Sequence, residues 1–441
     1  MSRTVAFTTL GCRLNQVDTQ QLQGLLEARG FETIDAWQRA DVVVVNTCTV
    51  TARAVLSDRQ AIRRAMRASP GARVVVTGCW AQTDPGLAAA IPGVDLVVGN
   101  ADKARLPELL ERLLDGAGAP RVAVADIAAV REIDAAAPAR ARGRSRAFLK
   151  IQDGCQHRCA FCIVPFARGS SRSLDAKLVA DRVRLLVEAG HPEVVLTGVD
   201  LGHYGADLVP RTTLAALLRA LVEIDGLRWL RLSSMLPAYF SDDVLEVVTG
   251  SAVIAPHFHV PLQSGSDRVL RLMRRPYTAA MYRRLVERLA AAIPGVGLGA
   301  DVIAGFPGES DADFAATLAL VRDLPLSYLH VFPYSERRGT EAVRLGGRVD
   351  HREAGRRSRA LRDAGAAKSL AFRRAMVGRR ETVLVLETRD RAGGGLIGLT
   401  GNYVEIVFDG DDRLMRTMTQ VRVTGAEAAV TRGRREEDAG A

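Results

Sequence analysis

The sequence has very little lysine and no long hydrophobic segment, and both shortages limit what the protein can be. Only four of the 441 residues are lysine, so arginine supplies nearly all of the positive charge, and the formal net charge is +10. No stretch approaches the roughly 20 apolar residues that a transmembrane helix needs. Residues 1–12 also lack the basic start and apolar run of a signal peptide. We therefore expect a cytoplasmic protein with no membrane partner.

The positive charge indicates an anionic partner. Guanidinium groups suit bidentate contacts with phosphate and stacking on bases. Net charge describes partners rather than fold, and an excess of arginine can also reflect genome composition. The charge alone is therefore only a weak indication of nucleic acid binding.

Residues 1–134 have the pattern of a parallel α/β domain. Short apolar strands alternate with helical patterns, as in sheets whose strands are joined by helices. The expected strands are Val5–Thr9, Val42–Val45, Val74–Thr77 and Asp95–Val98, and the expected helices are Thr19–Arg29, Arg59–Ala68 and Lys103–Leu114. Residues 135–146 are rich in alanine and arginine and have no apolar periodicity, so we expect a linker there.

Residues 147–375 contain a second α/β series. Six strand–helix units predict a full or partial (β/α) barrel, here a partial (β/α)6 barrel, followed by a basic helix. The expected strands are Ala147–Ile151, Val194–Thr197, Trp229–Leu232, His257–Leu262, Gly297–Ile303 and Tyr328–Phe332, and the basic helix covers His351–Ala375.

The pattern changes again at the carboxyl-terminal end. Four short strands with glycines between them predict a small closed β-barrel in residues 376–426. The expected strands are Thr382–Leu386, Leu396–Leu399, Tyr403–Phe408 and Thr419–Val423. Residues 427–441 are charged and alanine-rich, and we expect them to be disordered.

Six cysteines are present, and three of them lie close together in the sequence. In a cytosolic protein such thiols stay reduced, so clustered cysteines indicate metal binding or catalysis. Cys155, Cys159 and Cys162 follow the first barrel strand. Three thiolates can hold a 4Fe–4S cluster and leave one iron open for S-adenosylmethionine (SAM). A zinc site is the alternative, but it needs a fourth ligand that His157, inside the same loop, cannot easily provide.

The other three cysteines each follow one apolar strand of the first domain. Cys12, Cys48 and Cys79 come just after Val5–Thr9, Val42–Val45 and Val74–Thr77. Because the carboxyl ends of parallel strands share one edge, the three thiols should converge there. One buried cysteine is an ordinary core residue, but three in this position indicate a second, auxiliary 4Fe–4S cluster.

The residues around these cysteines resemble the methylthiotransferase family of radical SAM enzymes, over nearly the whole chain and in the same order. The segments around Cys12 and Cys48 are most similar to the branch of MtaB type, which modifies threonylcarbamoyladenosine in tRNA. One difference is Leu236, at a place where that branch is expected to have glutamate. The matching segments are Thr9–Gln16, Asn46–Thr51, Thr77–Gln82, Lys150–Cys155, Pro165–Ser173, Thr197–Gly205, His259–Asp267 and Asp301–Glu309.

The resemblance implies two 4Fe–4S clusters and two uses of SAM, one as methyl donor to sulfur and one as the source of a radical that activates a C–H bond. It implies a tRNA substrate, a reductant protein of flavodoxin or ferredoxin type, a sulfur donor, and an RNA-binding TRAM domain at the carboxyl-terminal end. The SAM contacts it suggests are Phe161, Thr197, Gly198, Asp200, Gln263, Ser264, Ile303 and Gly305, and the suggested RNA contacts are Arg379, Arg380, Asn402 and Tyr403.

Several alternatives stay open. The other branches of the family act on isopentenyladenosine in tRNA or on an aspartate of a ribosomal protein. A tRNA-binding protein with structural zinc would not be an enzyme at all. His257, His259 and His330 are expected to be packed or substrate-orienting residues rather than metal ligands. The arginines of the basic helix are either a solvated face or an RNA contact.

Overall fold

The computed structural model describes residues 3–133 and 145–436, which form two compact units. The first unit contains the described residues of Met1–Arg142 together with Gln152–Leu174 and Ser335–Val343. The second contains those of Gly143–Ile151, Asp175–Tyr334 and Arg344–Ala441. Most of the predicted linker, residues 135–144, lies outside the described residues. Within the described ranges, no helix is both long and apolar enough to cross a bilayer.

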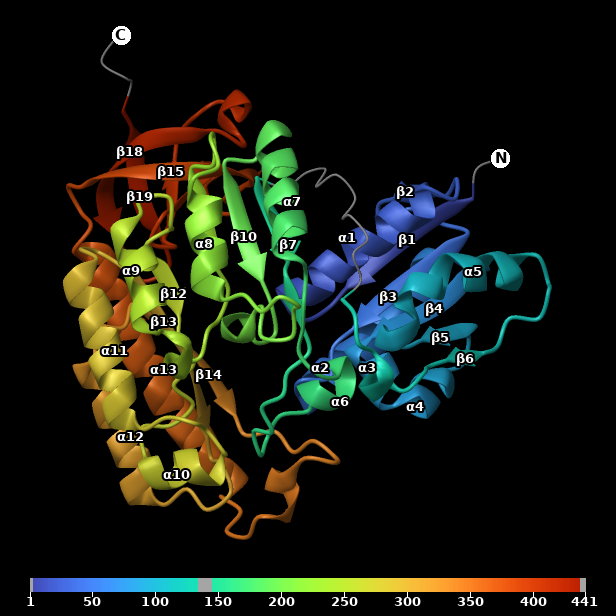
Figure 1. Cartoon of the computed structure of the whole chain (residues 1–441), viewed down its shortest axis with the longest axis horizontal. Helices are drawn as coiled ribbons and strands as arrows, with labels where there is room; N and C mark the ends of the chain where they lie inside the picture. The colour runs from blue at the N-terminus through green and yellow to red at the C-terminus, as the bar shows by residue number, and fades with distance from the viewer. Residues whose placement is uncertain (1–2, 134–144, 437–441) are drawn as a thin grey trace. The chain divides into compact units, whose positions relative to one another are not determined.

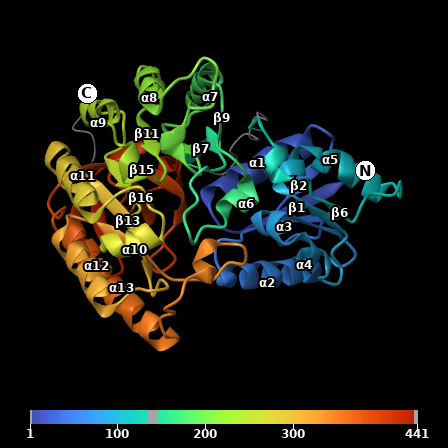
Figure 2. The same ribbon diagram turned by 60° about the horizontal axis from the view of Figure 1, so that its bottom comes forward.

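The first unit is built on a parallel sheet with helices on both faces, as the alternating pattern predicts. Its strands run in the order β2-β1-β3-β4-β5-β6. Leucines of α1 and α5 pack on one face of the sheet, and α2 packs on the other, so the sheet is buried on both sides. Figure 2 shows this layering. The elements are β1 (Thr4–Thr9), α1 (Arg13–Glu27), β2 (Glu32–Ile34), β3 (Val42–Thr47), α2 (Ala52–Ala68), β4 (Arg73–Gly78), α3 (Cys79–Thr83), α4 (Pro85–Ala89), β5 (Leu96–Val98), α5 (Leu106–Leu114) and β6 (Val122–Ala123).

Two helices of this unit begin earlier than their apolar patterns indicate. Helix α1 begins directly after Cys12, and α2 begins after Thr51, whose side chain accepts a hydrogen bond from the Ala54 amide. A side-chain cap therefore marks the start of α2, whereas Cys12 makes no such cap at the start of α1. The short strands β2 and β6, at the edges of the sheet, were not predicted from the sequence.

The second unit contains the partial barrel, with six parallel strands in two three-stranded sheets, β7-β10-β11 and β12-β13-β14. A single bridge between Leu230 and Ile254, just before β12, joins the two sheets. Figure 1 shows the helices outside the strands. The elements are β7 (Arg146–Lys150), α7 (Ala176–Glu188), β10 (Glu193–Thr197), α8 (Leu214–Val222), β11 (Trp229–Leu232), α9 (Asp242–Gly250), β12 (His257–His259), α10 (Asp267–Leu272), α11 (Ala279–Ala292), β13 (Gly297–Ala304), α12 (Asp311–Asp323), β14 (Tyr328–Pro333) and α13 (His351–Arg374).

Strand β12 is shorter than predicted. We expected it to continue to Leu262, but regular pairing ends at His259. Pro261 has no amide hydrogen to donate to a neighbouring strand. Val260 and Leu262 on either side still donate to carbonyl groups of β13, so the chain keeps its direction without forming a regular strand.

The carboxyl-terminal part of the second unit is a closed five-stranded barrel in the order β15-β16-β17-β19-β18. Its interior is filled by apolar residues such as Val383, Val385, Ile406, Phe408 and Val421. The strands are β15 (Arg380–Arg389), β16 (Leu396–Thr400), β17 (Glu405–Phe408), β18 (Met418–Ala426) and β19 (Thr431–Arg435).

Two expectations about this barrel were wrong. Residues 427–441 are not disordered throughout, because Thr431–Arg435 forms β19 and closes the barrel; residues 437–441 lie outside the described residues. The arginines of β19 are mostly exposed, so Thr431–Arg435 lacks the apolar pattern by which a strand is predicted. Tyr403 was expected inside a strand, but it lies in the turn between β16 and β17 with a φ of 73°.

Candidate active site

The three amino-terminal cysteines follow neighbouring strands of one sheet. Strands β1, β3 and β4 are adjacent, and their ends are in register, with Thr47 opposite Gly78. Cys48 and Cys79 are buried, whereas Cys12 is exposed. Burial raises the pKa of Cys48 to about 12, so a thiolate at this position requires a cation beside it, and a bound metal would supply one.

Asn15, on the first turn of α1, contacts the chain next to all three of these cysteines. Its side-chain amide donates to the Leu10 carbonyl at 2.8 Å and to the Thr47 carbonyl at 2.9 Å. Its Oδ1 lies 3.8 Å from the sulfur of Cys79. Asn15 is completely buried. One amide therefore holds the three strand ends in a fixed arrangement.

Gly11, the residue before Cys12, allows the backbone there to approach Cys48 closely. Its φ is 92°, in the left-handed region. A Cβ atom at this position would lie 2.7 Å from the Cβ of Cys48 and 2.9 Å from its sulfur. Any larger residue would therefore displace Cys48 from its place at the end of β3.

The second set of cysteines lies on a loop that a short antiparallel ladder closes. Strands β8 (Gln152–Asp153) and β9 (Arg172–Ser173) pair with each other. Inside the loop, the Cys155 amide donates to the Gly169 carbonyl, and the Cys162 amide donates to the Cys159 carbonyl, each at 3.0 Å. Helix α6 (Val164–Arg168) follows directly. This loop belongs to the first compact unit, which therefore contains all six cysteines.

Each set of three cysteines offers the kind of donor that iron–sulfur clusters use. Thiolates hold the irons of a 4Fe–4S cluster, and three of them leave one iron open for another ligand. Tetrahedral zinc, in contrast, needs a fourth ligand. The chemistry of the donors therefore fits an iron–sulfur cluster at each place.

Candidate SAM contacts in the second unit lie at or just after the carboxyl ends of barrel strands, where barrel enzymes bind their ligands. Thr197 ends β10, and Gln263 lies in the segment after β12 with a φ of 64°. Thr197 Oγ1 and Gln263 Oε1 are both buried without a hydrogen-bond partner. Buried polar atoms are almost always paired, so these two fit a site that a polar ligand completes.

The remaining suggested SAM contacts differ in what they can offer. Gly198 and Asp200 follow Thr197, and Asp200 accepts a hydrogen bond from Tyr239 at 3.3 Å. Ser264 is fully buried and pairs with Thr317 at 3.2 Å, so its hydroxyl serves the packing of the barrel. Ile303 and Gly305 lie at the end of β13, where the Gly305 amide donates to Glu309. Phe161, between Cys159 and Cys162, is half-buried in the first unit.

The three barrel histidines belong to one hydrogen-bonded row. The Tyr328 hydroxyl lies 2.8 Å from His257 Nε2 and 3.0 Å from His259 Nδ1. Asp301 Oδ1 lies 3.0 Å from His259 Nε2 and 3.3 Å from His330 Nδ1. Burial alone would raise the pKa of Asp301, but the hydrogen bonds from the two histidines outweigh it and hold that pKa well below its usual range. The role expected for these histidines, packing or orientation of a substrate, stays a prediction.

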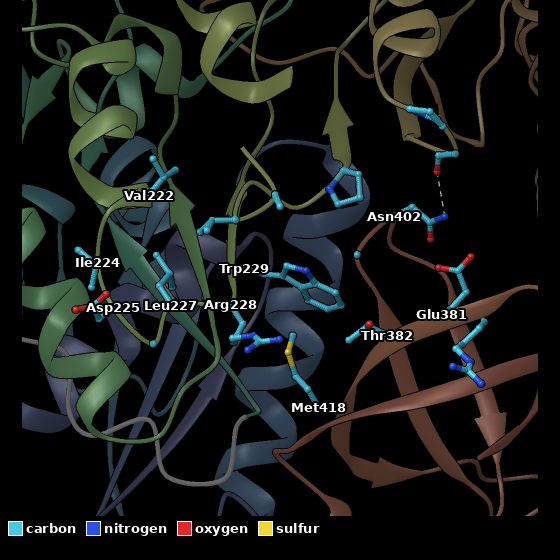
Figure 3. Close-up of a pocket in the computed structure, with 18 of the residues that line it drawn as sticks. Val222, Ile224, Asp225, Leu227, Arg228, Trp229, Glu381, Thr382, Asn402 and Met418 are labelled. Carbon is cyan, nitrogen blue, oxygen red and sulfur yellow. Dashed lines mark hydrogen bonds between the residues drawn. The ribbon is translucent and has the colours of Figure 1, made fainter. Parts of the chain in front are cut away.

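Three of the four suggested RNA contacts line one cleft of about 830 Å³ in the second unit. Figure 3 shows the indole of Trp229 on one side of this cleft and residues of the β-barrel on the other. Arg379 and Arg380 are exposed at the cleft. Asn402 is buried, and its amide donates to the Gly295 carbonyl at 3.0 Å.

Tyr403, the fourth suggested RNA contact, has neighbours within the second unit. Its ring stacks on His257 with 4.3 Å between ring centroids, and the guanidinium of Arg231 lies 5.1 Å from its centre. It also lines a second cleft of about 690 Å³, together with Arg146, Arg373 and other residues. RNA contact by Asn402 and Tyr403 stays a prediction.

The sequence analysis missed the buried charges around the cysteines. Arg168 pairs with Asp18 and Asp153, and Lys103 pairs with Asp18. All four side chains are almost completely buried. Arg168 lies inside a segment that matches the family, and Lys103 is one of only four lysines, but neither fact indicates a partner far away in the sequence.

Comparison with known proteins agrees with this geometry. Residues 149–321 match the radical SAM superfamily, and residues 4–99 match a family described as uncharacterized protein family UPF0004. The structure also resembles the radical SAM methyltransferase TsrM from Kitasatospora setae, with a TM-score of 0.57 and 20% identity, covering 76% of this chain and 75% of that one. At that identity the likeness concerns the fold alone. The fold and the sequence match define a radical SAM protein.

Relatives with higher sequence identity identify the family within this class. The chain is 38% identical to the threonylcarbamoyladenosine tRNA methylthiotransferase MtaB of Bacillus subtilis, over 96% of this chain and 94% of that protein. It is also 38% identical to a tRNA-2-methylthio-N(6)-dimethylallyladenosine synthase of Mycobacterium ulcerans, over 87% of this chain and 74% of that protein. The chain therefore belongs to the methylthiotransferase family of radical SAM enzymes.

Proposed function

We propose that this enzyme converts threonylcarbamoyladenosine beside the anticodon of tRNA into its 2-methylthio derivative. The observation that carries the proposal is the nearly full-length match to the B. subtilis MtaB protein. The M. ulcerans relative, named for a different adenosine, is equally similar but is matched over only 74% of its length. Isopentenyladenosine in tRNA is therefore the competing substrate, and the resemblance of the segments around Cys12 and Cys48 favours threonylcarbamoyladenosine.

We assign one 4Fe–4S cluster to Cys155, Cys159 and Cys162 and an auxiliary cluster to Cys12, Cys48 and Cys79. When bound, the clusters and SAM supply radical activation of a C–H bond and the methylthio group. The chain itself supplies the placement: Asn15 holds the first cysteine set, and the β8–β9 ladder closes the loop of the second. A flavodoxin- or ferredoxin-type reductant and a sulfur donor complete the proposed reaction, which takes place in the cytoplasm.

The five-stranded barrel is the proposed RNA-binding part, with the character of a TRAM domain. Its support is the exposed pair Arg379 and Arg380 at the edge of the cleft beside Trp229. Guanidinium groups there can contact phosphates. Such contacts release counterions from the nucleic acid, and this contribution to affinity becomes smaller as the salt concentration rises. We expect tRNA binding to weaken steeply with salt.

Iron content and SAM cleavage test the cluster assignment. Anaerobically purified and reconstituted protein should hold about eight irons, as two 4Fe–4S clusters require. Cys159→Ala should abolish formation of 5′-deoxyadenosine and lose about half of the iron. Cys48→Ala should lose a similar amount of iron but still cleave SAM without making the modified nucleoside. Stoichiometric zinc without iron in the wild type, or equal loss of SAM cleavage in both variants, would contradict the assignment.

Mass spectrometry of tRNA nucleosides tests the substrate. A strain without this gene should lose 2-methylthio-threonylcarbamoyladenosine and keep the unmodified nucleoside, provided that no second enzyme makes the product. Complementation with the wild-type gene should restore it, and complementation with the Cys48→Ala variant should not. Loss of the methylthio group from isopentenyladenosine, or from the ribosomal aspartate, would assign the enzyme to another branch.

A further inference from the structure

The proposed chemistry does not use the buried charge cluster in the first unit, and Arg168 is at its centre. Arg168 is the last residue of α6, and its side chain is only 4% exposed. One guanidinium nitrogen donates to both carboxylate oxygens of Asp153 at 3.0 Å. The other donates to Asn15 Oδ1 at 2.7 Å and to Asp18 Oδ2 at 2.9 Å.

The partners of Arg168 come from the two segments that carry the two cysteine sets. Asp153 lies two residues before Cys155, and its Oδ1 also accepts a hydrogen bond from the Gly154 amide at 2.8 Å. Asn15 lies three residues after Cys12 and holds the strand ends that lead to the first set. One guanidinium group therefore connects a residue beside the second set with the residue that organises the first.

A neighbouring hydrogen bond ties the same helix to the first set a second time. The Asn100 amide donates to the carbonyl of Ala167 at 2.7 Å and lies 3.8 Å from the sulfur of Cys79. Consecutive residues of α6 are thus bound to the surroundings of the first cysteine set. This double attachment fixes both the distance and the direction of the loop that carries the second set.

The charges of the cluster are balanced and specific for arginine. Lys103 donates to Asp18 at 2.7 Å, so two cations face two carboxylates in a buried place. Only the planar fork of arginine can address carboxylates on two sides at once, because an ammonium group is a point charge on a flexible stem. Lysine at position 168 would keep the charge and lose one of the two connections.

We propose that Arg168 is a positioning residue that fixes the spacing between the two cysteine sets, and so determines how often SAM cleavage ends in methylthiolated product. This inference rests on the proposed two-cluster function. A cluster that carries sulfur must sit at the right distance from the place where the substrate radical forms. Geometric misplacement of about 1 Å costs on the order of 100-fold in rate.

The test compares Arg168→Lys with the wild type in the full-length, cluster-reconstituted protein. The readouts are iron and sulfide content, the magnetic interaction between the two reduced clusters in electron paramagnetic resonance spectra, and the ratio of 5′-deoxyadenosine to methylthio nucleoside. We expect unchanged iron, an altered magnetic interaction, and a ratio that rises on the order of 100-fold because cleavage continues without product. Arg29→Lys, just after α1 in the same unit, is the control and should change neither the spectrum nor the ratio, because its ion pair with Glu111 lies at the surface.

A second variant covers the case in which Arg168→Lys fails to assemble its clusters. Asp153→Asn keeps the shape of the side chain and an acceptor for the Gly154 amide, but it weakens the tie to Arg168. It should shift the magnetic interaction and the ratio in the same direction by a smaller factor. An unchanged spectrum and ratio in the variants that retain iron would overturn the proposal. If the wild type makes no methylthio nucleoside from any tRNA, the proposed function fails, while the spectra still decide whether Arg168 sets the spacing.

Discussion

Removal of one partner from the buried ion pair between Glu193 and Arg231 should strongly destabilise the second unit. Glu193 is fully buried on β10 and Arg231 is 2% exposed on β11, with 2.7 Å between Oε1 and Nε. Arg231 also donates to the Gly401 carbonyl at 2.8 Å, in the turn after β16. The same side chain therefore neutralises a buried carboxylate and attaches the five-stranded barrel to the (β/α) barrel.

Arg231→Met removes the cation and leaves Glu193 buried without a partner. Breaking a buried pair in this way costs about 3–5 kcal/mol. The double variant Glu193→Gln/Arg231→Met leaves no charge at this pair. It still loses the hydrogen bonds to the Gly401 and Thr400 carbonyls, of which the shorter is worth about 1–3 kcal/mol. We therefore expect the double variant to be more stable than the single one by roughly 2 kcal/mol, although it carries more substitutions.

Urea unfolding followed by tryptophan fluorescence measures this difference. A chain of two units does not unfold in one step, so the signal must come from the second unit alone. The protein has three tryptophans, and Trp229 is the one in the second unit, where the Arg231 guanidinium lies 5.9 Å from its ring. In a background with Trp37→Phe and Trp80→Phe, equal destabilisation by the single and double variants would refute the reasoning, and so would a cost below about 1 kcal/mol for Arg231→Met.

Three further predictions concern other parts of the chain. Gly11→Ala should lose about half of the iron and retain SAM cleavage, because the new Cβ would displace Cys48; full iron content would contradict this. Burial, and then Arg416, lower the pKa of His191. Below about pH 6.5, the imidazole of His191 therefore takes up a proton more readily in the unfolded chain than in the folded one. Stability should fall as the pH drops from there to 5, and His191→Gln should remove up to about 1.4 kcal/mol per pH unit of that slope in unfolding measurements. Replacing Arg379 and Arg380 by glutamate should weaken tRNA binding and reduce its salt dependence in filter-binding assays, while SAM cleavage without tRNA stays unchanged.

The RNA prediction is better tested by these substitutions than by removing the β-barrel. Deletion from Arg379 onward would take away the Gly401 carbonyl that Arg231 contacts and would expose Trp229, which packs against Leu384 of the barrel. Loss of tRNA binding after such a deletion would then have two causes that the assay does not separate, the lost RNA contact and the destabilised (β/α) barrel. Both arginine side chains are exposed and neither takes part in this packing, and Arg380 forms an ion pair with Glu436.

Local patterns made much of the fold predictable from the sequence. The strand Trp229–Leu232 was predicted to the residue, because three of its four residues are apolar and polar residues lie on both sides of it. Strand β19 could not be predicted in this way, since Thr431 is buried but the arginines after it are mostly exposed. Its place in the barrel depends on pairing with β18, which no pattern within the segment reveals.

The candidate site shows the same difference between local patterns, which could be predicted, and long-range contacts, which could not. The cysteines could be found because each follows a recognisable strand, and the chain geometry gathers strand ends at one edge. Arg168 and Asn15 are 153 residues apart in the sequence, and they meet only because the loop with Cys155 packs in the first unit. Contacts of this kind depend on tertiary packing, so a single sequence contains no periodic signal for them.

The uses of arginine in the structure also change the meaning of the net charge. Arg168, Arg231 and Arg357 are almost completely buried and are paired with carboxylates. Each addresses two or more partners, which lysine could not do from one position. Part of the arginine excess therefore serves internal ion pairs rather than an anionic partner. An argument for RNA binding must rest on exposed arginines in a defined place, such as Arg379 and Arg380 at the cleft beside Trp229, and not on the total of +10.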